Sequence, residues 1–291
     1  MRSKMIMAFV TLLVAAFLSF GGAVPSGSNV ANGQKDTKAK APAGLSGFFR
    51  VVLNGFKVNH ESDDDIFEGD GKRDEVYLRA DVWMLNRDGS VPYRRSPRSV
   101  LMGDINNQNN PPRIAAGTAS DDGGLRTNDK WPISEPWRRV RNPLPDRPPM
   151  LLWEGTLVQG ENMVVILPTV WEWDSRDPSP SETAYDGLVD GWFNGGKRDL
   201  TVAIEHKSTA NLVFQKDIMF HREKGGTRPI GMYSGGNIGL LLRELSLTYD
   251  AALEAARSTP SNVGYGVFAI NYHDHEDHGD YTLYVQVEQI R

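Results

Sequence analysis

Carboxylate side chains are concentrated in three short segments of the chain. Eight of the fifteen residues from Glu61 to Glu75 are aspartate or glutamate. The other two segments contain Glu172, Asp174 and Asp177, and Asp274, Glu276, Asp277 and Asp280. Like charges at short range raise one another's pKa or require a counter-ion. Ca²⁺ takes six to eight oxygen ligands, which loops at one end of a β-sandwich can supply. The segments therefore predict a calcium site, and solvated loops of an acidic protein are the alternative.

The third segment also carries histidines, which suggests a different metal. Residues 273–278 read HDHEDH and satisfy the H-x-H-x-D-H pattern of metallo-β-lactamase-like hydrolases. Imidazole and carboxylate ligands suit zinc and can leave a position open for an activated water. By this resemblance His273, His275 and His278 would be the zinc ligands. In that family, however, further ligands and a helix follow the motif, whereas here thirteen residues follow His278 and 281–290 reads as a strand. The structural alternative is a hairpin loop between 263–272 and 281–290.

Other enzymatic patterns are absent from the sequence. The chain has no cysteine and no G-x-S-x-G, which excludes a thiol nucleophile and the usual serine-hydrolase motif. Carboxylate pairs suitable for glycoside hydrolysis are abundant, and tryptophans can stack on sugar rings. A carbohydrate-binding module or weak glycosidase that uses Trp131, Trp137 or Trp192 is therefore a second alternative.

Alternating apolar residues predict the strands that must position these segments. A period of two is typical of a strand with one buried face. It occurs at 49–53, 76–84, 163–167, 200–204 and 281–287. Many strands without interleaved long helices indicate an antiparallel β-sandwich or barrel, and we favour the sandwich. One short helix is expected at 249–257 (YDAALEAAR), which is rich in helix formers and precedes Pro260. Trp171 and Trp173 share a strand face, where core packing is the expected role.

A long irregular insert interrupts this pattern from residue 103 to residue 149. It is rich in asparagine and proline, a composition that favours turns and extended segments. Two interpretations of its aromatic and basic residues remain open. They form a binding surface, or the tryptophans fix the insert to the sandwich while the arginines stay solvated.

The N-terminus predicts export. Arg2 and Lys4 precede a short apolar run and then small residues, as in a secretory signal peptide over 1–23. A retained membrane anchor is the alternative. Residues 24–44 contain almost no large apolar side chain, so we expect a flexible leader there. The remainder, 45–291, is expected to be a single β-sandwich domain. Cleavage would change the net charge from −5 to −7, which argues against nucleic acid as a partner.

Two of the acidic segments resemble the calcium loops of C2 domains. Residues 71–78 (GKRDEVYL) resemble the first calcium loop, and 171–174 (WEWD) followed by 186–188 (DGL) resemble the third. The resemblance implies a C2-like sandwich with these calcium ligands: Asp74, Glu172, Asp174 and Asp186, with Asp64 or Asp65 in addition. The sequence departs from the pattern at Glu172, where aspartate is usual, and at Glu75, where proline is usual. These departures argue against membrane binding.

The sequence thus favours a secreted, non-catalytic β-sandwich whose acidic loops bind calcium for stability or for partner binding. The partner would be a protein, a glycan or a cell-surface component. Asp74 and Asp174 are the residues expected to matter most as ligands. Whether the three acidic segments lie at one end of the sandwich is left open by the sequence.

Overall fold

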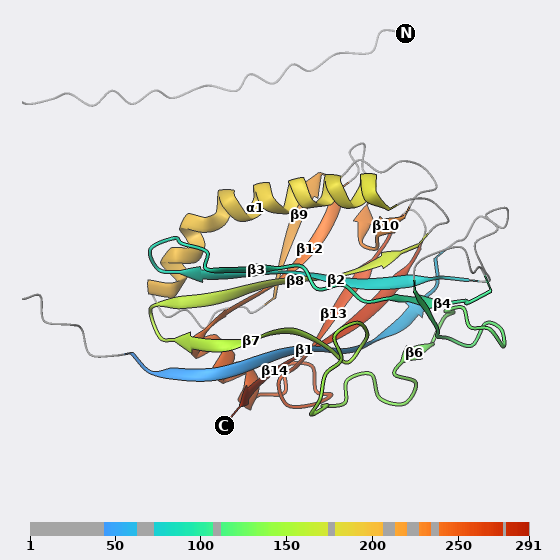
Figure 1. Cartoon of the computed structure of the whole chain (residues 1–291), viewed down its shortest axis with the longest axis horizontal. Helices are drawn as coiled ribbons and strands as arrows, with labels where there is room; N and C mark the ends of the chain where they lie inside the picture. Colours follow the sequence, from blue (N-terminus) through green and yellow to red (C-terminus); the bar gives the residue numbers. More distant parts are fainter. Residues whose placement is uncertain are drawn as a thin grey trace, which may run out of the picture. The chain divides into compact units, whose positions relative to one another are not determined.

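Two β-sheets make up most of the structure, a computed structural model that describes residues 44–62, 73–106, 112–173, 178–205, 213–219, 227–233, 239–275 and 278–290 (Figure 1). The sheets pack face to face as a β-sandwich, which agrees with the all-β prediction at this level. The predicted signal peptide and all of the leader except Gly44 lie outside the described residues. In the described part of the chain, no helix combines the length and the apolar character needed to span a membrane.

The first sheet is built around the N-terminal strand β1. It consists of β13 (Val267–His273), β14 (Asp280–Ile290), β1 (Ser46–His60), β7 (Met150–Val158) and β6 (Lys130–Trp131). β14 lies on one edge of β1, and β7 and then β6 lie on the other, all antiparallel. The predicted hairpin near the C-terminus is confirmed, because β13 pairs with β14 from Val267 to His273.

The second sheet is larger and is centred on β8 and β2. It consists of β9 (Val213–Met219), β10 (Arg228–Pro229), β11 (Met232–Tyr233), β12 (Gly239–Thr248), β8 (Asn162–Glu172), β2 (Val76–Asn86), β3 (Tyr93–Arg95), β4 (Leu101–Gly103) and β5 (Arg113–Ala115). β2 and β8 pair antiparallel over eleven residues, from Val76 opposite Glu172 to Asn86 opposite Asn162. Only the pairing of β4 with β5 is parallel among the strand pairs of the described residues.

The main core lies between the two sheets and confirms most of the predicted alternation. Val51 and Leu53 of β1, Leu78 and Val82 of β2, and Leu283 of β14 are fully buried in it. Burying each such side chain contributes about 1.5–3 kcal/mol. β1, β2 and β14 are therefore correctly predicted from the period-two pattern.

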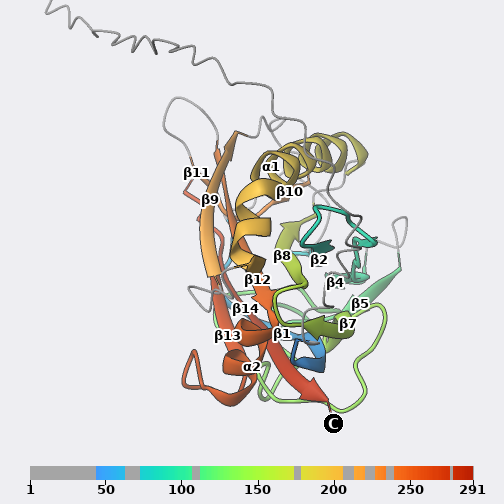
Figure 2. The ribbon, with the colours of Figure 1, turned by 90° about the vertical axis from the view of Figure 1, so that its left-hand side faces the viewer.

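A second core lies on the outer face of the second sheet, under a long helix that the sequence reasoning missed. Helix α1 (Ser179–Glu205) places Tyr185, Val189 and Phe193, spaced four residues apart, against that face (Figure 2). Phe193 stacks on Trp83 of β2 with ring centroids 4.7 Å apart. The expectation of strands buried on one face is therefore wrong for β2 and β8. Both are buried on two faces because α1 covers the outer one.

The strand predicted at 200–204 is also wrong, because these residues form the last turns of α1. Leu200 and Ile204, four residues apart, lie on one side of the helix, and Ile204 is fully buried. Val202 falls between them and is 43% exposed. A short alternating run fits both periods, and here it reflects the helical one. The fold thus has a long helix in addition to the expected short one.

Helix α2 (Tyr249–Arg257) has the predicted bounds. Thr248 caps its N-terminus, since its Oγ1 accepts a hydrogen bond from the amide of Ala251 at 3.2 Å. Ala252 and Ala255 face the main core. Small side chains on this face let the helix pack closely against the sheet.

The insert 103–149 is largely irregular over its described residues, as predicted. Its strand β5 belongs to the second sheet, and its later part packs on the first sheet. Its strand β6 pairs Trp131 with Phe56 of β1. Trp137 meets Tyr284 of β14 edge to face, with centroids 5.5 Å apart. Gly55 permits the close approach, because a Cβ there would lie 2.2 Å from the Trp131 carbonyl oxygen. These contacts favour the view that the tryptophans fix the insert to the sandwich.

Candidate functional site

The first two acidic segments leave the sandwich from neighbouring strand ends. The first segment precedes β2 and the second follows β8, and the register pairs Val76 with Glu172 (Figure 1). Just beyond the paired residues, the amide of Trp173 donates to the Glu75 carbonyl at 2.7 Å. Backbone hydrogen bonds therefore hold the bases of both segments side by side.

Asp74 joins the first acidic segment to the start of β14, directly after the third segment. The backbone amide of Ser62 lies 3.1 Å from Asp74 Oδ1 and 2.9 Å from Oδ2, so it donates to the carboxylate. The hydroxyl of Tyr281, at the start of β14, donates to the same carboxylate. Asp74 is 1% exposed. Its carboxylate thus fixes both ends of the loop between β1 and β2 against β14.

Arg228 connects the second segment to the third. Its side chain forms an ion pair with Glu172, and its Nε lies 3.6 Å from Asp274 Oδ2. All three side chains are buried. Asp274 is held in turn by its own amide, which donates to the Gly279 carbonyl at 2.7 Å. The described residues of the three acidic segments therefore lie at one end of the sandwich, which we call the acidic end.

Asp104, which sequence reasoning missed as a site residue, lies beside Glu75 at the same end. Its amide is 3.3 Å from Glu75 Oε1, and its Oδ1 accepts a hydrogen bond from the amide of Asn106 at 2.7 Å. Asp104 is 1% exposed, and within the described residues its Oδ2 has no hydrogen-bond partner. A buried oxygen of this kind calls for an explanation such as a bound ion. Its position directly after β4 is the sequence signal that could have found it.

Gly103 makes this approach possible. Its φ is +152°, and a Cβ at this position would lie 2.9 Å from the Asp74 carbonyl oxygen. Only glycine leaves room for the backbone of the first acidic segment to pass so closely. The conformation of Gly103 thus places Asp104 against the base of that segment.

The predicted calcium ligands are distributed unevenly. Asp74 and Glu172 lie at the acidic end, each already bonded as described above. Asp64, Asp65 and Asp174 lie outside the described residues. Among the residues that the structure describes, no group of three or more histidine, aspartate or glutamate side chains has the geometry to hold a metal ion. The calcium site therefore stays a prediction.

Asp186 lies apart from this cluster, on α1. Its carboxylate pairs with the buried Arg79 of β2, which also bonds Asp81 Oδ1 at 3.0 Å. Burial opposes the charge of Arg79, but the neighbouring carboxylates, Asp81 first, outweigh it and hold its pKa above the usual value. Burial likewise raises the pKa of the adjacent Tyr185 phenol. These groups attach α1 to the second sheet.

The three histidines lie at the turn between β13 and β14. The rings of His273 and His275 meet edge to face with centroids 4.7 Å apart. His273 Nδ1 is 3.6 Å from Asp280 Oδ2, and the His273 side chain is 49% exposed. His278 has a φ of 59°, which suits the tight turn of a hairpin. The zinc alternative stays a prediction, and the hairpin expected from the sequence is present.

Of the aromatic residues considered in the sequence, Trp171 and Trp173 are buried, as predicted for core packing. Trp192 is partly buried on α1, with its ring centroid 6.4 Å from that of Trp83. Trp131 and Trp137 fix the insert, as described above. Trp137 also lines a pocket on the outer face of the first sheet.

Comparison with protein-family models, with curated proteins and with solved structures gives no match. The C2-like resemblance therefore stays a proposal. The acidic end contains several carboxylate groups, and Ca²⁺ takes oxygen ligands of this type.

Proposed function

We propose that this chain is an exported, non-catalytic β-sandwich protein, C2-like in type, that binds Ca²⁺ at its acidic end. The ion would stabilise the loops there or help them present a surface to a protein, glycan or cell-surface partner. The observation that carries the proposal is the hydrogen-bonded pairing of Val76 with Glu172, because it brings the bases of two acidic segments together.

Asp104 adds independent support. Its buried Oδ2 has no hydrogen-bond partner among the described residues, and it lies beside the first acidic segment. A carboxylate oxygen in this state is suited to coordinate a cation. We therefore assign Asp104 as a ligand, together with Asp174 and either Asp64 or Asp65 from the adjoining segments.

Asp74 and Glu172 take supporting roles in this proposal. Both oxygens of Asp74 already accept hydrogen bonds, so it positions the loop between β1 and β2. Glu172 is held by Arg228. Neutralising either side chain would disturb the fold itself, so neither is a clean test of calcium binding.

Thermal unfolding in EDTA and then in about 2 mM Ca²⁺ tests the proposal. A ligand at about 100 times its dissociation constant adds about 2.7 kcal/mol to the free energy of unfolding. For a chain of this length we expect Tm to rise by several degrees with Ca²⁺. The double variant Asp104→Asn, Asp174→Asn should lose this rise and keep its Tm in EDTA within a few degrees.

The matched control is Asp199→Asn, which removes one carboxylate from the exposed surface of α1. It should respond to Ca²⁺ as the parent chain does. No rise in the parent chain, or a full rise in the double variant, would contradict the proposal. A rise with Zn²⁺ alone would favour the histidine segment instead.

A further inference from the structure

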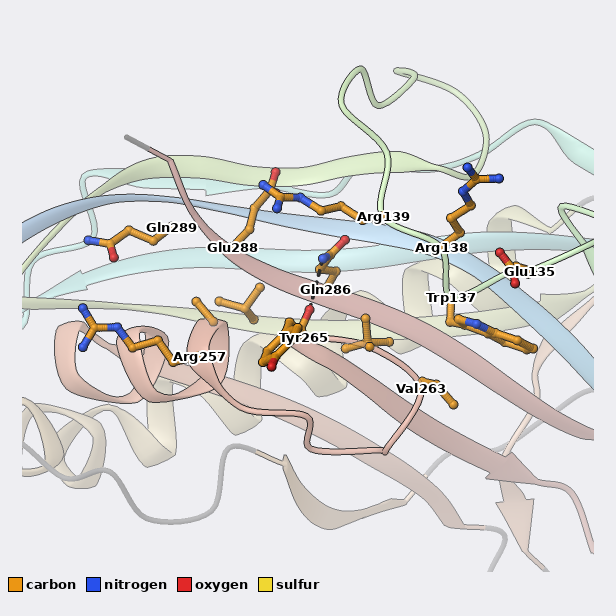
Figure 3. A pocket seen from close by; sticks show the side chains of 14 residues that line it. Glu135, Trp137, Arg138, Arg139, Arg257, Val263, Tyr265, Gln286, Glu288 and Gln289 are labelled. Carbon is orange, nitrogen blue, oxygen red and sulfur yellow. Dashed lines mark hydrogen bonds and ion pairs between the residues drawn. The ribbon is translucent and has the colours of Figure 1, made fainter.

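A pocket of about 580 Å³ lies on the outer face of the first sheet, beside the C-terminal half of β14. Figure 3 shows its floor on β14, at Gln286 and Glu288, and its two walls. One wall is the insert segment 135–139, and the other is the C-terminal end of α2 with the following loop to Tyr265. This pocket is separate from the acidic end, which adjoins the start of β14.

Buried amides fix both walls to the floor. The Nδ2 of Asn54 donates to the carbonyl of Trp137 and to Oε1 of Gln286, both at 3.1 Å. Gln286 then donates from Nε2 to the carbonyl of Tyr265 at 3.2 Å. Asn54 and Gln286 are 1% and 4% exposed. The walls are thus positioned by the fold, so a ligand would not have to order them on binding.

Two arginines of the pocket lining are available to bind an anionic ligand. Glu288 is paired with Arg139 at 2.6 Å and with Arg50 at 3.2 Å. Arg138 and Arg257 are exposed, and within the described residues their side chains have no hydrogen bond or ion pair. The other charged residue of the lining, Glu135, is exposed. Three arginines therefore face two glutamates here, in a chain whose net charge is −5.

An exposed aromatic ring also lines the pocket. Tyr265 is 70% exposed, although the surrounding backbone is well fixed (Figure 3). Gly266 holds this turn, with a φ of +72° and an amide bonded to the Ser258 carbonyl at 2.8 Å. A large ring held in solvent by a rigid turn offers a flat apolar surface to a ligand.

We propose that this pocket binds an acidic saccharide, that is, an oligosaccharide bearing carboxylates such as a uronic-acid chain. The ring of Tyr265 would stack on the apolar face of a sugar. Arg138 and Arg257 would bind its carboxylates, for which the planar guanidinium offers paired donors. A neutral sugar would leave both arginines unused. Nucleic acid is disfavoured because the chain as a whole is acidic.

Calorimetric titration of the purified chain with tetragalacturonic acid tests this proposal. The carboxyl-reduced, neutral tetrasaccharide and inorganic phosphate are the two comparison ligands. We expect the acid to bind at least tenfold more tightly than either, and binding to weaken as salt is added because surface charges are screened. Binding should be the same in EDTA, which separates this site from the proposed calcium site.

Two variants locate the site. Tyr265→Ala and the pair Arg138→Gln, Arg257→Gln should each weaken binding of the acid at least tenfold. The matched control Arg95→Gln, an exposed arginine on β3, should leave it unchanged. No binding by the parent chain, equal affinity for the neutral sugar or for phosphate, or retained affinity in both pocket variants would overturn the proposal. All of these chains should show the same far-ultraviolet circular dichroism and Tm.

Discussion

Replacing Arg228 with methionine removes the guanidinium that connects two buried carboxylates at the acidic end. Its Nε lies 3.6 Å from Asp274 Oδ2, and its Nη2 contacts Glu172. The three side chains are 6% exposed or less. At this separation and an effective dielectric constant of about 20, the Coulomb attraction within one ion pair is about 4–5 kcal/mol, and the desolvation of both ions opposes it. Removing one partner of a buried pair typically costs about 3–5 kcal/mol. We therefore expect the free energy of unfolding to fall by about 3–5 kcal/mol.

Urea unfolding followed by tryptophan fluorescence measures this loss, with Arg95→Met as the exposed control. The double variant Arg228→Met, Glu172→Gln should lose less than the two single variants added together, because its members share one contact. A loss below about 1 kcal/mol in Arg228→Met would refute the reasoning, since it would place the pair in a solvated environment.

The same variant also reports on calcium. Arg228 adds a positive charge to the acidic end, so its removal should strengthen binding of a cation there. The rise in Tm with Ca²⁺ should therefore be larger in Arg228→Met than in the parent chain. An unchanged or smaller rise would indicate that any calcium binds elsewhere.

Three further predictions concern the fold. Phe193→Ala should lower the free energy of unfolding, measured in urea, by about 3–5 kcal/mol, because it leaves a cavity over Trp83. A loss below about 1 kcal/mol would contradict the packing of α1 on the second sheet. Gly266 and Gly89 both have a positive φ, but only at Gly266 would an added Cβ clash, at 2.0 Å from the carbonyl oxygen of Val287. Gly266→Ala should therefore lower Tm far more than Gly89→Ala. Equal decreases in Tm would contradict this prediction. Burial raises the pKa of three phenols, Tyr77, Tyr185 and Tyr272. Below about pH 10 the folded and unfolded chains both keep these protons, so stability is complete there. Above it the unfolded chain loses them first, and each phenol lowers the free energy of unfolding by about 1.4 kcal/mol per pH unit. The part of the absorbance change at about 295 nm that comes from these three phenols should therefore appear only as circular dichroism is lost, after the exposed tyrosines have ionised. Ionisation of these three phenols in a folded chain would contradict the prediction.

The local pattern of apolar residues and helix formers was sufficient to predict β1, β14 and α2. β1 and β14 alternate over many residues with one face in the main core, and α2 has good helix formers and a threonine cap. α1 was missed because Gly187, Gly191, Gly195 and Gly196 interrupt it, and glycine is a poor helix former. Its stability comes instead from packing against the second sheet. Because this packing joins segments that are far apart in the chain, the local sequence of α1 gives only a weak helical pattern.

For the acidic end, the sequence shows where carboxylates are concentrated but not how the strands bring them together. Clustered carboxylates at 61–75 and after β8 indicated a cation site. The pairing of Val76 with Glu172, and the position of Arg228 between Glu172 and Asp274, depend on strand order and could not be predicted from the sequence. The same holds for the pocket at Tyr265, whose walls lie more than a hundred residues apart in the chain.

Equilibrium dialysis of the purified chain against Ca²⁺ tests the central claim most directly. The bound metal would be measured after the protein has been stripped with EDTA. We predict bound Ca²⁺ at a fixed stoichiometry of at least one ion per chain, and loss of that ion in the Asp104→Asn, Asp174→Asn variant. No bound Ca²⁺ at millimolar concentration, or the same stoichiometry in the variant, would contradict the assignment of the acidic end as a calcium site.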